Sequence, residues 1–243
     1  ASITPPRPTP KRRACLSHPR TSGIVPTFVT PLFAAYRPRY LLHFSVALLV
    51  AGQLLAVRLP PGFQIRYPIC FVLSVLYSVP PFRFKAVAGV DWVINMWGFG
   101  TLTPYAAWAA TGRALDLGHG LVLLAFCPLF AGLYPLTQLY QFDEDRRRGD
   151  RTLALILGMR ASLFVALGAT LLAFALLAWA GLILSVEWKG LTLILPLVLW
   201  LAVLWPWIAQ QVTWTPQQHQ RGMYRALAAW AVTDLTVLFV FAT

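Results

Sequence analysis

The sequence predicts an all-α integral membrane protein, a helical bundle with about seven transmembrane helices. Apolar residues make up 58% of the chain, charged residues make up 12%, and the mean hydropathy is +0.64. This composition is too apolar for an ordinary soluble domain. The apolar residues also occur in runs that approach the roughly 20 residues a helix needs to cross the hydrocarbon core. Runs this long and continuous exclude the alternating strands of a membrane barrel, so helices are the predicted spanning form.

The chain divides into a tail and a membrane domain. Residues 1–37 are basic and rich in proline, and no acidic residue occurs before Asp91. Frequent prolines and the lack of apolar periodicity predict that this tail is disordered. Residues 38–243 are predicted to form the transmembrane domain.

Seven apolar segments follow the tail, and each is predicted to form a helix. The second segment is marginal in length unless it begins in the interfacial region of the bilayer. In chain order the segments are Tyr40–Val57, Gln64–Val79, Val90–Ala110, Leu117–Tyr140, Ala161–Val186, Leu191–Gln211 and Ala226–Ala242.

The distribution of positive charge predicts how these helices are oriented. A net charge of +12 could suit a nucleic-acid-binding protein, but most of the cations flank apolar segments, so we expect a lipid bilayer and no nucleic acid as partner. With the tail in the cytoplasm, all but four of the 20 Lys and Arg lie on the cytoplasmic side. The positive-inside rule then places the loop around residues 143–151 in the cytoplasm. The membrane is expected to be the plasma membrane or another energy-transducing membrane.

That loop holds an unusual concentration of acids. Half of the eight Asp and Glu residues lie within residues 143–150, namely Asp143, Glu144, Asp145 and Asp150. Because carboxylates near membrane spans are costly, their gathering indicates a site that uses negative charge. With Gln141 they offer the hard oxygen ligands that Mg²⁺ prefers when substrate phosphates complete its shell. The alternative is a solvated loop that anchors two helices.

Two more loops lie on the same side. Arg83 and Lys85 follow a Pro pair, and Asp91 and Asn95 come four residues apart at the start of the third segment, so they share a helical face. The helix that starts there would turn the positive end of its dipole toward an anion. The alternative is a juxtamembrane anchor with a buried Asn. His219, in the last polar loop, is expected to be solvated.

One motif carries a family resemblance. Asp145, Gly149, Thr152, Leu153 and Ala154 form the pattern Asp-x-x-x-Gly-x-x-Thr-Leu-Ala. This pattern resembles the second aspartate-rich motif of the UbiA superfamily of intramembrane prenyltransferases. The sequence LYSVPPFRFK is similar to the family's segment between its fourth and fifth helices, and the similarity runs from about Pro38 to Thr243. It implies a UbiA-like bundle in which the seven segments are equivalent to helices three to nine of a nine-helix fold.

The resemblance also implies a chemistry. In the family, Mg²⁺ and cationic side chains hold a polyprenyl diphosphate, the diphosphate leaves, and a lipid-soluble acceptor attacks the allylic carbocation. The implied catalytic residues are Asp145, Asp143 and Lys85, and the implied metal ligands are Asp143, Asp145 and Glu144, with Asp150 less closely matched. The implied substrate-binding residues are Arg83, Asn95, Asp91, Gln141 and Arg147.

The sequence departs from the family pattern in two places. Gln141 stands where the second motif usually begins with Asp, and the first aspartate-rich motif is missing because no acid precedes Asp91. The first two helices of the family fold are therefore expected to be lost or replaced by the Pro/Arg-rich tail. One explanation is a truncated gene start. The other is that the tail is authentic, in which case one metal site has been lost.

The predicted function is transfer of a polyprenyl group from its diphosphate to a hydrophobic acceptor with Mg²⁺. The alternative is a catalytically impaired homologue that acts as a noncatalytic subunit and binds an isoprenoid or a pigment. A transporter is a weaker alternative, because the centres of the segments hold almost no charged residues that could line a pathway.

Overall fold

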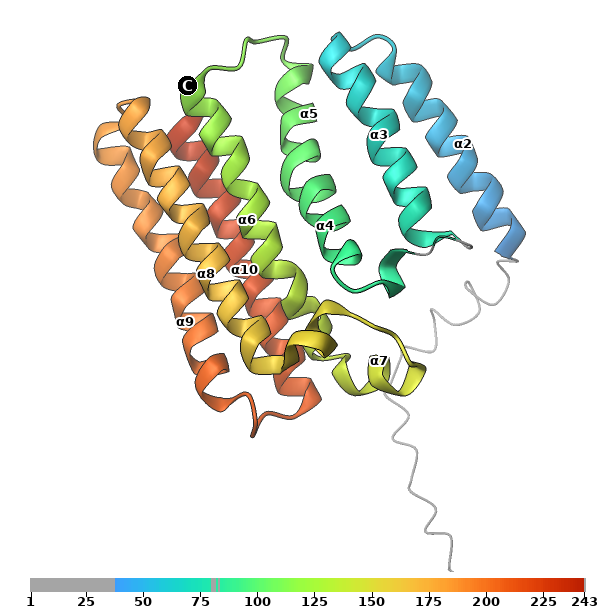
Figure 1. The fold of residues 1–243 in the computed structure, drawn as a ribbon. Coiled ribbons are helices and arrows are strands. Elements are labelled where there is room, and N and C mark those ends of the chain that lie inside the picture. Colours follow the sequence, from blue (N-terminus) through green and yellow to red (C-terminus); the bar gives the residue numbers. More distant parts are fainter. Residues whose placement is uncertain (1–37, 80–81, 83, 243) are drawn as a thin grey trace, which may run out of the picture. The chain divides into compact units, whose positions relative to one another are not determined.

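The computed structural model describes residues 38–79, 82 and 84–242. The predicted tail and Arg83 therefore lie outside the described residues. Helix α2 (Pro38–Ala56) crosses the boundary between a first unit, residues 1–48, and a second unit, residues 49–243. The second unit holds all the other described elements, which are drawn in Figure 1.

The described chain is mainly helical, and all seven predicted segments are helices. In order after α2 they are α3 (Pro61–Ser78), η1 (Phe84–Ala86), α4 (Val90–Trp97), the π-helical turn η2 (Gly98–Leu102), α5 (Thr103–Ala110), α6 (Leu117–Leu139), α7 (Phe142–Arg148), α8 (Leu153–Ile183), η3 (Glu187–Leu193), α9 (Ile194–Gln210) and α10 (Pro216–Phe241). The third predicted segment corresponds to α4, η2 and α5 together, and α7 lies within the acidic loop. No strand occurs in the described part of the chain, which contains one isolated bridge between Val87 and Arg151.

Two helices begin earlier than predicted. Helix α8 runs from Leu153, but Gly158 breaks it with a φ of 79° and a ψ of 163°. The short apolar segment before the break was not predicted, and the long segment after it starts at Met159, two residues before the predicted start at Ala161. Helix α10 starts at Pro216 rather than Ala226, although its first two turns are polar. Its start is stabilised by a capping box, in which the Thr215 hydroxyl accepts from the Gln218 backbone N–H and the Gln218 side chain accepts from the Thr215 N–H.

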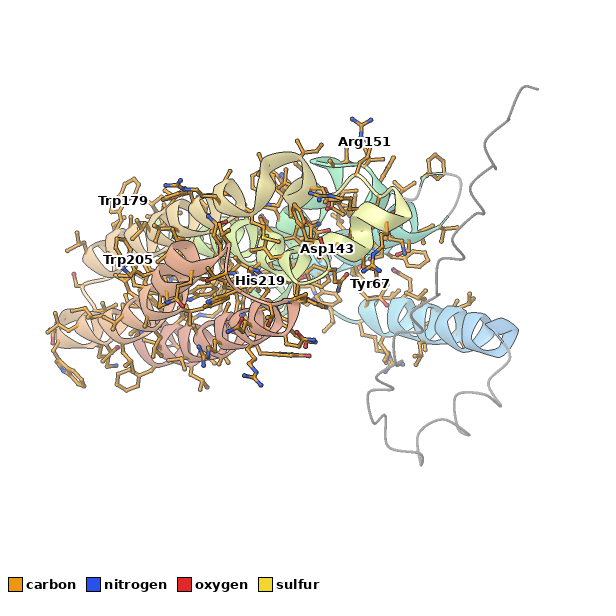
Figure 2. All side chains as sticks on the ribbon, turned by 90° about the horizontal axis from the view of Figure 1, so that it is seen from below. Tyr67, Asp143, Arg151, Trp179, Trp205 and His219 are labelled. Atoms are coloured by element: carbon orange, nitrogen blue, oxygen red, sulfur yellow. The ribbon has the colours of Figure 1, made fainter. Side chains whose placement is uncertain are left out.

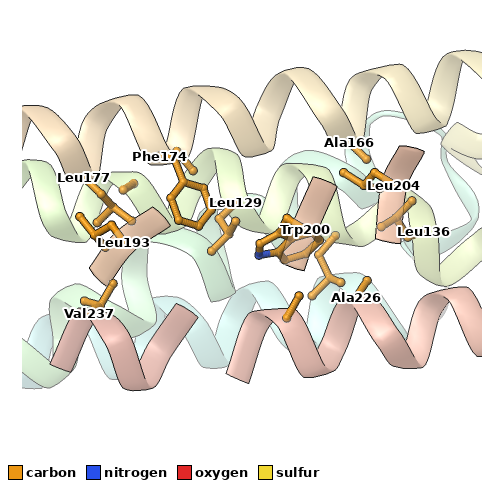
Figure 3. Close-up of a cluster of buried hydrophobic side chains, with 14 of the residues drawn as sticks. Leu129, Leu136, Ala166, Phe174, Leu177, Leu193, Trp200, Leu204, Ala226 and Val237 are labelled. Carbon is orange, nitrogen blue, oxygen red and sulfur yellow. The ribbon is translucent and has the colours of Figure 1, made fainter. Parts of the chain in front are cut away.

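Helices α6, α8, α9 and α10 pack side by side (Figure 1), and the buried core lies among them (Figure 3). Trp200 of α9 is fully buried there, and its Nε1–H donates to the Thr233 hydroxyl of α10 at 3.1 Å. Outside this core the helices present apolar side chains, such as Trp179 and Trp205 (Figure 2). Four helical stretches in the described chain are long and apolar enough to cross a bilayer: Leu117–Leu139, Leu153–Ile183, Glu187–Gln210 and Pro216–Phe241.

Small residues allow α6 and α8 to approach closely. Ala166, Ala173 and Ala180 recur every seventh residue along α8 and are fully buried. A Cβ atom on Gly132 of α6 would lie 2.9 Å from the Ala166 carbonyl oxygen. Close packing of this kind, rather than apolar burial alone, holds helices together in lipid, because the lipid tails are as apolar as the side chains.

This contact gives a stability prediction. Gly132→Ala should force α6 and α8 apart and lower the free energy of unfolding by about 1–3 kcal/mol. Gly168→Ala is the matched control, because a Cβ there meets no atom within 4 Å; it should stabilise α8 by about 0.5–1 kcal/mol. Unfolding followed by circular dichroism in detergent micelles measures both changes. Equal stability of the two variants would contradict the close approach.

Candidate functional site

The segment before α4 meets the segment after α7. Val87 and Arg151 pair as an isolated parallel bridge, although 64 positions separate them in the chain. Lys85 lies in η1, two residues before this bridge, and Asp150 directly precedes Arg151. The bridge therefore brings a cation from one loop toward acids from the other.

A cavity of about 300 Å³ opens where these segments meet, and we call it the Lys85–Asp145 cavity. Its walls come from α3, η1, the end of α6, α7 and the start of α8, and all its side chains are polar. They are Tyr77, Lys85, Tyr134, Thr137, Gln138, Tyr140, Gln141, Asp145, Asp150 and Thr152. Lys85, Gln141 and Asp145 of the predicted site residues thus share one cavity, together with the less closely matched Asp150.

The short helix α7 turns Asp145 into this cavity. Asp145 is buried, whereas Asp143 and Glu144 on the same helix are exposed. Gly149 ends α7 with a φ of 74°, a left-handed conformation that glycine adopts without steric cost. The chain then folds back, and the Asp150 N–H donates to the Asp145 carbonyl at 3.1 Å. Both carboxylates consequently line the same wall.

Behind this wall a buried hydrogen-bond network joins four helices. The fully buried Asp91 of α4 accepts from Gln138 Nε2 at 2.9 Å and from the Tyr134 hydroxyl at 3.2 Å, both on α6. Gln138 Oε1 in turn accepts from the Ala154 backbone N–H at 3.1 Å, at the start of α8. The Tyr134 and Tyr77 hydroxyls lie 3.0 Å apart, which adds α3. Asp91 thus fixes the orientation of two side chains that line the cavity.

The structure separates the other predicted residues from this cavity. Asp143 lies on the opposite side of α7 and lines a second cavity with His219. Glu144 is exposed, and Arg147 is exposed with its Nε donating to the Asp143 backbone carbonyl at 3.1 Å. Asn95 lines a third cavity, of about 270 Å³, between α3 and α4–η2, where its Nδ2 donates to the Asp91 carbonyl at 2.8 Å.

His219 is not solvated as predicted but buried, because its loop is the first turn of α10 packed against α9. Its Nδ1 accepts from Trp207 Nε1 at 2.8 Å. Figure 2 labels Asp143 and His219 in a view from below.

Sequence reasoning missed Tyr134 and Gln138, although a signal was present. They are four residues apart in an otherwise apolar run, and Gln141 follows three residues later, so the three form one polar stripe at helical spacing. Thr152 belongs to the motif that carries the resemblance and Tyr77 lies in the segment LYSVPPFRFK, but neither was predicted to be a site residue.

The donors in the Lys85–Asp145 cavity fit a hard divalent cation. Two carboxylates, amide oxygens and hydroxyls line it, and none of the described residues in its walls carries a thiol or an imidazole. The Thr152 hydroxyl is buried there without a hydrogen-bond partner, and a buried polar atom normally has one. Among the described residues no three His, Cys, Asp or Glu side chains gather as a closed metal centre. Mg²⁺ often binds through only one or two carboxylates plus substrate phosphates, so the cavity suits that mode.

The buried network gives a second stability prediction. Asp91→Leu leaves the Gln138 amide and the Tyr134 hydroxyl without their acceptor, which should lower the free energy of unfolding by about 2–4 kcal/mol. Asp91→Asn keeps one acceptor oxygen for these two donors. Its NH₂ group can take the position of Oδ1, which has no hydrogen-bond partner. We therefore expect this variant to lower the free energy of unfolding by about 1 kcal/mol or less. Unfolding in detergent micelles compares the two variants. A similar loss for both would show that the acceptor role is not what stabilises this region.

Comparisons with known proteins agree with this architecture. A family model described as "UbiA prenyltransferase family" matches residues 34–233. A solved structure of a UbiA homologue from Archaeoglobus fulgidus, bound to Cd²⁺, is similar with a TM-score of 0.60 and 16% sequence identity, covering 82% of this chain and 74% of that chain. No curated protein matches the sequence.

Proposed function

Since the chain belongs to the UbiA prenyltransferase family and is an integral membrane protein, we propose that it transfers a polyprenyl group from its diphosphate to a lipid-soluble acceptor. The reaction would take place at the Lys85–Asp145 cavity. The observation that carries this proposal is the composition of that cavity, where one ammonium group, two carboxylates and an unpartnered hydroxyl converge at the end of an apolar bundle.

The cavity would hold the diphosphate of the donor. The Lys85 ammonium group would donate charge-assisted hydrogen bonds to phosphate oxygens. The unpartnered Thr152 hydroxyl can donate as well, and Thr152 directly precedes α8, so the positive end of that helix dipole lies at the same wall. These groups stabilise the negative charge that develops on a departing diphosphate.

Asp145 and Asp150 would hold a divalent cation, with the side-chain amide oxygen of Gln141 as a further ligand. We propose Mg²⁺, whose preferred ligands are carboxylate, carbonyl and phosphate oxygens. When bound, it supplies positive charge that neutralises the leaving diphosphate. Asp143 and Glu144, on other sides of α7, stay outside this group of ligands.

The prenyl chain would lie toward the third cavity. Tyr77 lines both this cavity and the Lys85–Asp145 cavity, and the other walls include Leu73, Ile94 and Phe99. In the reaction the bond between the allylic carbon and the diphosphate oxygen breaks, the diphosphate takes the electron pair, and the acceptor attacks the allylic carbon and loses a proton. Apolar walls keep water from capturing the carbocation.

A second candidate function is isoprenoid binding without catalysis. The observation that favours it is the small number of acids, because Asp145 and Asp150 are the only described acids that line the cavity.

We further propose that this end of the bundle faces the cytoplasm of an energy-transducing membrane, because the positive-inside rule, applied to the sequence, assigns all but four of the 20 Lys and Arg to the side of the acidic loop.

Metal removal tests the proposed function. The purified chain is incubated with radiolabelled geranylgeranyl diphosphate, Mg²⁺ and a panel of quinone precursors, and both prenylated product and released pyrophosphate are measured. Treatment with EDTA should abolish both, and added Mg²⁺ should restore them. Retention of the labelled diphosphate without product would support the noncatalytic candidate, and neither binding nor product would overturn both.

A further inference from the structure

The second cavity, on the far side of α7, has a volume of about 580 Å³ and lies outside the diphosphate chemistry. We call it the Arg160–Asp143 cavity. It is bounded by α7, the early part of α8, and the connection between α9 and α10. Its residues lie at the ends of the four candidate spanning helices, so its mouth is at the membrane–water interface.

One side of the cavity favours an anion. Helix α8 is broken at Gly158, whose φ of 79° and ψ of 163° are not helical, so a second helical segment starts at Met159 and lines the cavity with its N-terminal end. Arg160 lines the same side, and its guanidinium group lies over the Phe164 ring, 5.8 Å from the ring centroid.

A side-chain amide adds hydrogen-bonding groups to this side. Gln211, at the end of α9, is 92% buried and lines the cavity. Its amide can donate to and accept from a ligand held there.

The other side of the cavity carries the opposite charge. Asp143 lines it, yet Asp143 and Arg160 form no ion pair with each other in the described part of the chain. Two unlike charges held apart across one cavity complement a ligand that has both charges itself. A simple anion would be repelled by Asp143, and a simple cation by Arg160.

The floor of the cavity is preorganised and apolar. Trp207 Nε1 donates to Nδ1 of His219, and the Trp214 ring stacks on Trp207 with centroids 5.7 Å apart. Met159 and Leu157 add apolar surface beside the charged groups. A rigid aromatic and aliphatic wall next to separated charges suits the head of an amphiphile whose chains remain in the bilayer.

We propose that the Arg160–Asp143 cavity binds the headgroup of a phospholipid with a phosphate and a primary ammonium, as in phosphatidylethanolamine. The phosphate lies against Arg160, the Gln211 amide and the start of the second α8 segment. The ammonium group donates to Asp143. This site requires no prenyl donor and does not depend on the proposed transferase activity.

Native mass spectrometry of the purified chain, titrated with palmitoyl-oleoyl phosphatidylethanolamine, phosphatidylglycerol or phosphatidylcholine, tests the proposal. Phosphatidylethanolamine should bind about tenfold more tightly than the other two, because phosphatidylglycerol lacks a cation and phosphatidylcholine cannot donate a hydrogen bond to Asp143. Asp143→Asn should remove this preference. Arg160→Gln should weaken binding of all three lipids about tenfold, since it removes the contact to the phosphate.

Arg225→Gln is the matched control, because Arg225 is an exposed cation of α10 that does not line the cavity. It should leave the lipid preference unchanged. Circular dichroism of each variant confirms that it is folded. Equal binding of the three lipids by the unaltered chain, a preference that survives Asp143→Asn, or unchanged binding by Arg160→Gln would overturn the proposal.

A final arm separates a lipid from a soluble ligand of the same chemistry. Soluble phosphoethanolamine is added in excess over bound phosphatidylethanolamine. If the acyl chains contribute as proposed, the lipid stays bound. Displacement at comparable concentrations would assign the cavity to a free zwitterion and overturn the lipid assignment.

Discussion

Asp145→Asn is expected to lower the rate of prenyl transfer by about 10²- to 10³-fold, the loss typical when an electrostatic contact to a developing charge is removed. Asp145 is buried in the wall of the Lys85–Asp145 cavity, and the substitution keeps its size while removing its charge. Release of pyrophosphate from radiolabelled geranylgeranyl diphosphate, measured under single-turnover conditions, gives the rate of the chemical step.

Asp143→Asn is the matched control for this substitution. Asp143 belongs to the same short helix but lines the cavity on the opposite side. Because of that separation, the fall in the transfer rate caused by Asp143→Asn should be less than about one tenth of the fall caused by Asp145→Asn. If the two variants lose the same activity, α7 as a whole supports the reaction and the separation of the two acids has no catalytic meaning.

Lys85→Gln is expected to weaken binding of the prenyl diphosphate by about 10- to 100-fold, the equivalent of one charge-assisted hydrogen bond to phosphate. Lys85 lines the cavity from η1. The dissociation constant is measured with the labelled diphosphate in the presence of Mg²⁺. Lys85→Arg keeps the charge and should recover most of the affinity.

Lys189→Gln tests whether the loss is specific. Lys189 lies in η3 and lines a cavity shared with Leu184 and Val240, away from Lys85. Its removal also takes one positive charge from the protein, but the affinity for the diphosphate should not change. An equal loss in both variants would indicate general attraction of the anion to a basic protein.

The fold could largely be predicted because the length and continuity of apolar runs determine which segments span a bilayer. The errors occur at helix ends. The start of α10 was missed because Thr215 and Gln218 stabilise a polar first turn that hydropathy alone excludes. The break at Gly158 was also missed, since a single glycine in an apolar run gives no sign of its φ of 79°.

The candidate site could be predicted only in part. The clustering of acids and the position of Lys85 after a Pro pair pointed to residues that the structure brings into one cavity. Which acid of α7 faces that cavity depends on the rotation of the helix. Residues two positions apart differ by about 200° around a helix, and the rotation of α7 is set by its start at Phe142 and its end at Gly149. The burial of Asp91 depends on partners from α6, which sequence spacing does not identify.

The central claim is that Asp145 and Lys85 jointly bind a metal-bound diphosphate. The most direct test is calorimetric titration with a thiolodiphosphate analogue of geranylgeranyl diphosphate, which binds without reacting, in the presence and absence of Mg²⁺. The structure predicts binding that requires Mg²⁺ and that weakens by about tenfold or more in both Asp145→Asn and Lys85→Gln. Binding of equal strength without Mg²⁺, or unchanged in both variants, would contradict the claim.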